Sequence, residues 1–426
     1  MRKILFISYY FPPLGGVASI RSMKFVKHLA AMDYNIIVLS VQAKYLRHPK
    51  DPELLLELPN SVEVHRAFCP DMNWLFKLLW GLRLNWLVKL IRQRLLIPDT
   101  EKLWLPFARK KLHAILTAHR DIAISVVSSG PPSVLFLGLE LKNRYSVHFI
   151  CDFRDEWTNN PERINLDYPA STQSRELILE AGILMASAGI VYLTQIMKDN
   201  FERSYPFIRE KPSEIIPNGF DEDDFKGLTV KPSSDTFVLL YSGSFYDRRQ
   251  PDPLWKAISK LAQSGAINPK HFRVEIIGKN TPTFVLGAFA KDALINEIVN
   301  IEGFKPHRVS LQAMYNADAL LLFIPSGKNT DSVLTGKIFD YLRSGKAILA
   351  IVPPKGLAAE IVLKAGSGFV AEHSDFDGIK RCLKEVYELW QAGRLSDLKT
   401  DKDYINGFSR QQQAMRLAAL IDKALI

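Results

Sequence analysis

The stretch Thr335–Ala350, TGKIFDYLRSGKAILA, constrains the fold more than any other part of the sequence. It predicts a turn, a short helix, a second turn and a buried strand, which together form the repeating unit of a parallel α/β sheet. Gly336 and Lys337 fall at the helix start, where backbone N–H groups and the helix dipole attract phosphate. Asp340 follows one turn later, where a carboxylate can accept hydrogen bonds from ribose. The stretch therefore indicates a nucleotide diphosphate site, and it is also compatible with an ordinary helix–strand unit.

Strand and helix patterns alternate along the whole chain, which favours parallel sheets with helices on both faces. A first series of strands is predicted at 3–11, 35–41, 62–67, 124–129, 147–153 and 190–194. A second series is predicted at 237–243, 272–278, 298–304, 319–325 and 347–352. Helices are predicted between them, for example at 17–32, 104–119 and 173–188, and again from about residue 409.

The turn at Pro217-Asn218-Gly219 and the polar stretch 226–236 separate the two series. We therefore expect an α/β protein with two Rossmann-like, doubly wound domains, covering residues 1–217 and 218–408. Two such domains would face each other across a cleft that the carboxyl ends of their strands line.

Composition narrows the class of protein. The chain has 426 residues, of which 47% are hydrophobic and 23% charged, as in a globular protein with large cores. Its three cysteines form no metal-binding or CxxC pattern, which predicts reduced thiols in a cytosolic protein. Pro12-Pro13 interrupts the first apolar run before a secretory signal is complete. Two uncharged stretches, 122–139 and 181–197, are interpreted as buried α/β segments.

The net charge of +10 is concentrated in one region. Residues 77–111 contain nine basic residues against Asp99 and Glu101, a net of +7. Trp74, Trp80 and Trp86 stand among these charges and suggest an interfacial helix, so residues 73–111 are a candidate surface for an anionic membrane. Helices that simply pack on their own domain would fit the pattern too. Nucleic acid is disfavoured because no recognised nucleic-acid motif accompanies the charge.

Several loops that follow predicted strands carry candidate site residues. Gly15 and Gly16 can let the backbone approach a ligand, and a helix starts behind them. In residues 241–251, YSGSFYDRRQP, Gly243 allows a tight turn after the strand. Arg248 and Arg249 in the same loop can bind a diphosphate through paired hydrogen bonds.

Three further loops add polar or aromatic candidates. The segment CDFRDEWTNNP, residues 151–161, places an arginine and three acids after a strand, which is more typical of a cleft than of a core. Gly278 and Lys305 follow two strands of the second series, and Phe304 can pack against a base.

Taken in order, these segments resemble the GT-B glycosyltransferases, specifically glycosyltransferase family 4. The matching pieces are ILFISYYFPPLGG with Arg21, CDFRDEW, IIPNGFDEDDF, LLYSGS, VEIIGKN, VNIEGF, YNADALLLFIPS and TGKIFDYLRSGKAILA. The resemblance implies that the second domain holds most of the nucleotide-sugar donor and that the last helix, 409–426, crosses back onto the first domain. It also implies retention at the anomeric carbon and no bound metal or other cofactor.

The resemblance assigns roles to individual residues. Gly15 and Gly16 would approach the donor phosphates, Arg248 or Arg249 would neutralise the diphosphate, and Lys337 would assist at the helix start. Further contacts to the donor are expected from these positions: Gly243, Gly278, Phe304, Lys305, Ser332, Thr335, Gly336 and Asp340.

Three positions depart from the family pattern. The family often has two glutamates at the positions of Ser332 and Asp340, and an arginine at the position of Ser244. Many members have a histidine near the sugar, and this chain offers Asp152, Arg154 and Asp155 near that point. Asp155 is therefore included among the candidate catalytic residues with Arg248, Arg249 and Lys337.

The sequence thus predicts a cytoplasmic enzyme, peripheral on the inner face of the cell membrane. It would transfer a hexose or related sugar from a nucleotide diphosphate sugar to a glycan or lipid-linked acceptor, in the synthesis of cell-surface polysaccharide. Two alternatives stay open: a nucleotide-sugar epimerase on the same fold, and a non-catalytic scaffold that binds sugar or lipid.

Overall fold

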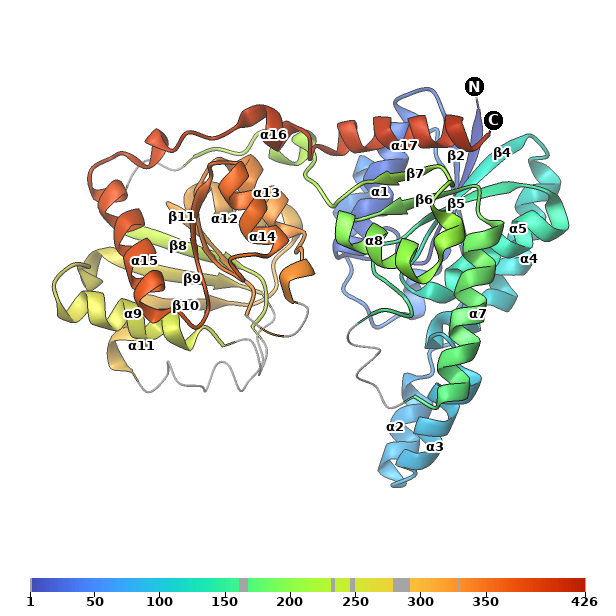
Figure 1. The fold of residues 1–426 in the computed structure, drawn as a ribbon, viewed down its shortest axis with the longest axis horizontal. Helices are drawn as coiled ribbons and strands as arrows, with labels where there is room; N and C mark the ends of the chain where they lie inside the picture. The colour runs from blue at the N-terminus through green and yellow to red at the C-terminus, as the bar shows by residue number, and fades with distance from the viewer. Residues whose placement is uncertain are drawn as a thin grey trace. The chain divides into compact units, whose positions relative to one another are not determined.

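The computed structural model describes residues 2–160, 168–230, 234–245, 250–278, 292–325, 327 and 330–425. The chain divides into two compact units. The first unit consists of Met1–Asn218 together with Arg410–Ile426, and the second unit is Gly219–Ser409. Each unit contains one parallel sheet flanked by helices (Figure 1), as the alternating sequence pattern predicts. The two units are described separately below.

The first unit has a seven-stranded sheet in the order β3-β2-β1-β4-β5-β6-β7, with all neighbouring strands parallel. Its strands are β1 (Lys3–Ser8), β2 (Asn35–Val41), β3 (Glu63–Ala67), β4 (Ile122–Ser128), β5 (His148–Asp152), β6 (Gly189–Tyr192) and β7 (Ser213–Ile215). The central strands β1 and β4 are buried along most of their length because helices cover both faces.

Most helices of the first unit cover one of the two faces of this sheet. The helices are α1 (Val17–Ala30), α2 (Asn73–Gly81), α3 (Asn85–Leu90), α4 (Leu105–Ala118), α5 (Leu135–Tyr145), α7 (Ala170–Ala186), α8 (Gln195–Ser204) and α17 (Arg410–Ala424). The pair α2 and α3 extends beyond the sheet and has a small core of its own (Figure 1). Phe25 of α1 and Leu417 of α17 belong to the core on one face, whereas Leu112 of α4 and Leu137 of α5 belong to the core on the other. The C-terminal helix therefore completes the first unit.

The second unit has a six-stranded parallel sheet in the order β10-β9-β8-β11-β12-β13. Its strands are β8 (Phe237–Ser242), β9 (Phe272–Ile277), β10 (Val299–Glu302), β11 (Ala319–Phe323), β12 (Ala347–Ile351) and β13 (Gly368–Ala371). Its helices are α9 (Asp252–Gln263), α11 (Ala293–Ile298), α12 (His307–Asn316), α13 (Lys337–Ser344), α14 (Leu357–Lys364), α15 (Phe376–Gln391) and α16 (Lys402–Asn406). In each sheet the strand order reverses beside the first strand of the unit, β1 or β8, and ligands of such sheets bind near that point.

None of the described helices is long and apolar enough to cross a membrane. The uncharged stretch 122–139 forms β4 and the beginning of α5. The stretch 181–197 forms the end of α7, then β6 and the beginning of α8. The interpretation of both stretches as α/β segments is therefore confirmed.

Candidate functional site

Lys337 lies at the carboxyl edge of the second sheet, against the end of β8. It is the first residue of α13, and its Nζ is 4.1 Å from the centre of the Tyr241 ring. A Cβ atom on Gly243 would lie 2.0 Å from this Nζ. Glycine at position 243 therefore leaves the space that the lysine ammonium occupies, and the structure brings these two predicted residues together.

A hydrogen bond from the end of β8 also holds α13 in place. The backbone N–H of Ser242 donates to Tyr341 Oη at 2.9 Å. Tyr341 is buried, and burial raises the pKa of its hydroxyl far above its usual range, so the group stays neutral. Ser332 lies in the short 3-10 turn before α13, and Thr335 Oγ1 is buried without a hydrogen-bond partner among the described residues. Gly336 precedes α13 and provides no side-chain cap, and the N–H groups of Ile338 and Phe339 donate to Thr335 O and Gly336 O, both at 3.3 Å. The helix dipole still favours an anion at this end.

Gly278 closes the neighbouring strand end. Its N–H donates to Glu302 O at 3.2 Å, and the N–H of Gly243 donates to Ile277 O at 2.7 Å. A Cβ atom at position 278 would lie 2.2 Å from Gly243 O, a backbone atom that cannot turn aside. The ends of β8, β9 and β10 are thus joined by close backbone contacts that require glycine at position 278.

Asp340 lies one turn into α13 and faces a histidine that the sequence did not single out. His307 Nε2 is 3.6 Å from Asp340 Oδ2, and His307 Nδ1 is 3.9 Å from Asp224 Oδ2. His307 begins α12, two residues after Lys305, which pairs with Glu302 at 3.0 Å. The predicted ribose carboxylate therefore belongs to a cluster of acidic and basic groups.

Two other predicted contacts have different outcomes. Phe304 follows β10 and is 59% exposed, so its ring is accessible for stacking. Arg248 and Arg249 lie outside the described residues. Their proposed contact with a diphosphate stays a prediction.

In the first unit, the loop with Gly15 and Gly16 connects β1 to α1. Gly15 N–H donates to Pro49 O at 2.9 Å, and Gly15 O lies 3.0 Å from His48 Nε2. Gly16 has a φ of 94°, and its carbonyl accepts the N–H of Ser19 at 3.1 Å at the start of α1. The loop is therefore held by the segment after β2, and its contact with a donor phosphate stays a prediction.

The charged segment after β5 is divided between the core and the surface. Asp152 Oδ1 is 2.8 Å from Arg21 Nη2, and both side chains are buried. Arg21 also donates to Ile216 O at 2.9 Å and to Pro217 O at 2.8 Å. Burial alone would raise the pKa of Asp152, but the guanidinium of Arg21 holds it below its usual range. The expectation that this cluster belongs to a cleft is thus wrong for Asp152.

Arg154 and Asp155 take up different positions. Arg154 is buried and donates to Ser129 O at 2.6 Å and to Gly130 O, and burial lowers the pKa of its guanidinium. Asp155 is exposed. It remains a candidate catalytic residue because its carboxylate is accessible near the carboxyl end of β5.

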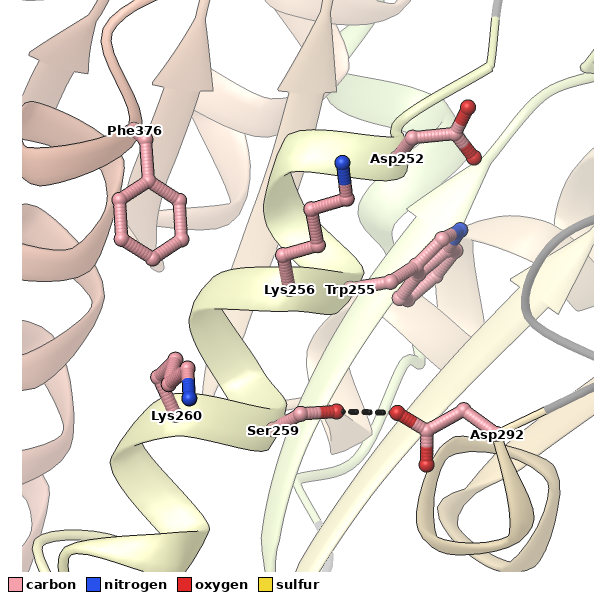
Figure 2. A pocket seen from close by; sticks show the side chains of 7 residues that line it. All are labelled: Asp252, Trp255, Lys256, Ser259, Lys260, Asp292 and Phe376. Carbon is pink, nitrogen blue, oxygen red and sulfur yellow. Dashed lines mark hydrogen bonds between the residues drawn. The ribbon is translucent and has the colours of Figure 1, made fainter.

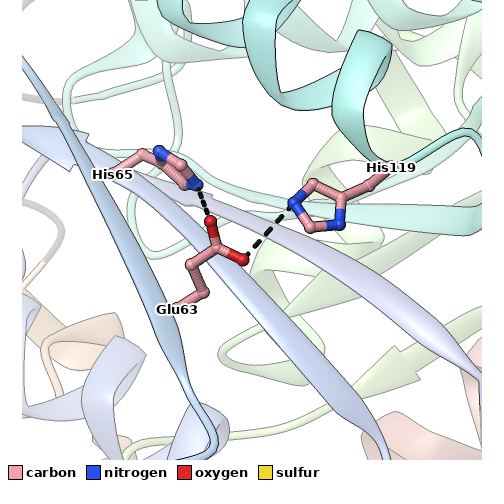
Figure 3. A group of neighbouring side chains, drawn as sticks. All are labelled: Glu63, His65 and His119. Carbon is pink, nitrogen blue, oxygen red and sulfur yellow. Dashed lines mark ion pairs between the residues drawn. The ribbon is translucent and has the colours of Figure 1, made fainter.

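One group of side chains in the first unit has the composition of a metal site. Glu63, His65 and His119 place their ligand atoms within 4.8 Å of one another (Figure 3). However, Lys3 Nζ lies 3.5 Å from His119 Nδ1, and an ammonium can only donate. In the neutral ring Nε2 then carries the proton and donates to Glu63, at 3.3 Å. This geometry favours a hydrogen-bonded cluster of Glu63 with the two histidines over a metal centre.

A hollow of about 580 Å³ lies beside α9 in the second unit (Figure 2). Its lining comes from α9, from Phe376 of α15 and from Asp292, which accepts a hydrogen bond from Ser259 Oγ at 2.6 Å. None of the predicted site residues that the structure describes lines this hollow. The candidate site therefore remains the group of Gly243, Gly278 and Lys337 at the carboxyl edge of the second sheet, which we call the strand-edge cluster.

Comparison with known proteins identifies the architecture. The sequence matches no protein-family profile and no curated protein. Among solved structures, it is similar over 100% of its length to 98% of a glycosyltransferase from Rickettsia africae, with 14% identity and a TM-score of 0.65. It is also similar over 99% of its length to 98% of sucrose-phosphate synthase from Thermosynechococcus elongatus, with 13% identity and a TM-score of 0.62. The same coverage, 99% and 98%, relates it to WaaG, a glycosyltransferase involved in lipopolysaccharide biosynthesis, with 14% identity and a TM-score of 0.57.

The chain has the GT-B fold. At these identities the likeness concerns the fold, so membership of glycosyltransferase family 4 stays a prediction. The strand-edge cluster nevertheless lies where ligands bind in open α/β sheets, at the carboxyl ends of the strands.

Proposed function

We propose that this protein is a retaining glycosyltransferase that uses a nucleotide diphosphate sugar. The acceptor would be a glycan or a lipid-linked sugar in the synthesis of cell-surface polysaccharide. The observation that carries the proposal is the position of Lys337: its ammonium fills the space beside Gly243 at the carboxyl edge of the second sheet, at the start of α13. The solved structures with the same fold include several glycosyltransferases, which supports the reaction class.

The proposed chemistry depends on charge at the leaving group. When the bond between the anomeric carbon and the diphosphate breaks, negative charge develops on the β-phosphate. Lys337 and the N–H groups at the start of α13 would stabilise this charge, with Arg248 or Arg249 as further cations. Asp340 would accept hydrogen bonds from the ribose, and Phe304 would stack on the base. Lys337, the arginines and the N–H groups would supply the positive charge without a metal ion.

We also propose a cytoplasmic location on the inner face of the cell membrane, where a lipid-linked acceptor would be found. The basic, tryptophan-rich part of residues 73–111 supports this location, and its surface is treated in the next subsection.

A panel of nucleotide diphosphate sugars tests the proposal. A donor that binds only the folded state at 100 times its Kd should stabilise the protein by about 2.7 kcal/mol and raise its melting temperature. The donor that does so should then be hydrolysed slowly or transferred to an acceptor. Absence of any shift across the panel would contradict the proposal.

The same experiment separates the alternatives. Release of an epimerised sugar nucleotide without an acceptor would identify an epimerase. Donor binding with neither hydrolysis nor transfer, tested with several acceptors, would favour a scaffold.

A further inference from the structure

The segment 73–95 forms a helical hairpin with an unusually apolar surface. It consists of α2, α3 and the π-helical turn Ile91–Leu95, and we refer to it as the tryptophan hairpin. Figure 1 shows α2 and α3 beyond the sheet of the first unit, at the end of α7, and Thr172 Oγ1 of α7 donates to Gln93 O at 2.9 Å. Trp74, Trp80 and Trp86 are 61%, 48% and 65% exposed. Four leucines are exposed as well: Leu78, Leu82, Leu90 and Leu95.

None of these exposed side chains belongs to the hairpin's own core, although the centre of the Trp80 ring lies 5.9 Å from the guanidinium carbon of Arg92. The interior of the hairpin is a small separate core made of Phe76, Leu79 and Val88, completed by Leu96 directly after the hairpin. The turn between α2 and α3 is closed by backbone bonds, with Arg83 at a φ of 59°. The exposed tryptophans and leucines are therefore available to a partner, and apolar surface of this extent marks an interaction site.

Charge on the hairpin has one sign. Its five basic residues are all exposed: Lys77, Arg83, Lys89, Arg92 and Arg94. The sequence contains no acidic residue between Asp71 and Asp99. The hairpin thus combines a net charge of +5 with aromatic side chains that prefer the boundary between water and hydrocarbon.

We propose that the tryptophan hairpin binds the surface of an anionic lipid bilayer. Tryptophan and leucine side chains would enter the headgroup region, and the basic side chains would meet lipid phosphates. A second copy of this chain is a poorer partner, because two identical faces would place five positive charges against five. The inference goes beyond glycosyl transfer, since it concerns where the protein is held and requires no turnover.

The base of the hairpin lies next to the carboxyl edge of the first sheet. A hollow of about 80 Å³ there is lined by Tyr9, which follows β1, by Cys69, which follows β3, and by Phe76 and Arg92 of the hairpin. A bilayer bound by the hairpin would therefore bring lipid headgroups toward this edge. A lipid-linked acceptor would then reach the first unit without leaving the membrane.

Vesicle co-sedimentation of the full chain tests the inference. Binding to vesicles of equal parts phosphatidylcholine and phosphatidylglycerol should exceed binding to phosphatidylcholine alone, and it should fall as salt is added. The variant Lys77→Gln/Arg83→Gln/Lys89→Gln should bind the anionic vesicles roughly 10²-fold more weakly, which corresponds to about 1 kcal/mol for each basic side chain. The variant Trp74→Ser/Trp80→Ser/Trp86→Ser should lose at least about tenfold.

Matched controls separate the hairpin from general effects of charge and apolar surface. Arg120→Gln/Lys260→Gln/Arg381→Gln removes the same charge from exposed positions elsewhere, and Leu56→Ser removes a side chain that is 85% exposed. Both should bind vesicles as the unmodified protein does, and all variants should keep its melting temperature. Equal binding to both kinds of vesicle, equal loss in the controls, or unchanged binding by both hairpin variants would overturn the inference. A dimer in sedimentation velocity that Trp74→Ser/Trp80→Ser/Trp86→Ser dissolves would also overturn it.

Discussion

Replacing Lys337 with methionine isolates the charge at the start of α13. Methionine keeps an unbranched stem beside the Tyr241 ring but removes the ammonium, which lies 4.1 Å from the ring centre. The lost cation–π contact is worth about 0.5–2 kcal/mol, and a sulfur–aromatic contact returns about 0.3–1.5 kcal/mol. We therefore expect the free energy of unfolding to change by less than about 2 kcal/mol. Loss of one electrostatic group at a developing charge should lower kcat by about 10²–10³.

Gly243→Ala should reproduce this effect by a different route. Its new methyl carbon would lie 2.0 Å from Lys337 Nζ, the end of a flexible chain, so the ammonium must move by more than 1 Å to restore normal contact. A displacement of about 1 Å can cost about 10²-fold in rate. Once the ammonium is gone, the methyl group keeps only milder contacts, 3.2 Å from Tyr241 Cζ and 3.2 Å from the position of Lys337 Cε. The double variant should therefore be about as slow as the slower single variant.

The assay is steady-state kinetics with the donor selected by thermal shift, at a temperature where every variant is folded. Lys346→Met is the matched control, because Lys346 follows the C-terminal end of α13, at the opposite edge of the sheet. Near-native kcat for Lys337→Met would refute the role of the ammonium. Fully additive losses in the double variant would refute the geometric link between Gly243 and Lys337.

The other expectations are as follows. Asp340→Ala should weaken donor binding by about 1–3 kcal/mol in calorimetry with little change in melting temperature, because one charge-assisted hydrogen bond is removed. Gly278→Ala should lower the urea midpoint markedly, since its methyl group meets Gly243 O at 2.2 Å. Turnover should survive a metal chelator, and reversible loss of activity in the chelator would contradict the metal-free chemistry. Arg21→Met should cost about 3–5 kcal/mol of stability at neutral pH, because it leaves Asp152 buried and unpaired. The pKa of Asp152 is lower in the folded protein than in the unfolded chain. The ion pair therefore stabilises the protein above about pH 4, and this contribution is lost as the pH falls through the folded pKa. Urea unfolding curves of Arg21→Met and of the unmodified protein should thus converge in acid.

The strands were predictable where burial on both faces produces a long apolar run. KILFIS and AILAI are such runs, and both are buried strands in the structure. Two strands at the ends of the sheets were not predicted. Ser213–Ile215 and Gly368–Ala371 are only three and four residues long, and most of their side chains are partly exposed. Their pairing depends on the neighbouring strand, which local sequence does not reveal.

Only the part of the candidate site that follows from the order and direction of the strands was predictable from the sequence. Parallel strands end at one edge, so Gly243 and Gly278 were expected near each other, and Lys337 joins them because α13 starts at the same edge. His307 was missed, since a histidine at a helix start has no distinctive local pattern. Its position beside Asp340 arises from the packing of α12 on α13.

The segment after β5 shows why a charged motif does not reveal its own environment. Sequence places Asp152, Arg154 and Asp155 within four residues, yet one is paired in the core, one bonds to backbone carbonyls, and one is exposed. The difference depends on Arg21, which is 131 residues away in the chain and reaches Asp152 from α1. Arg21 also bonds the carbonyls of Ile216 and Pro217, so it connects α1, β5 and the last residues before the second unit. Because breaking a buried pair leaves an uncompensated charge, this contact fixes the arrangement of three distant segments, and the Arg21 found in the N-terminal motif is explained by that structural role.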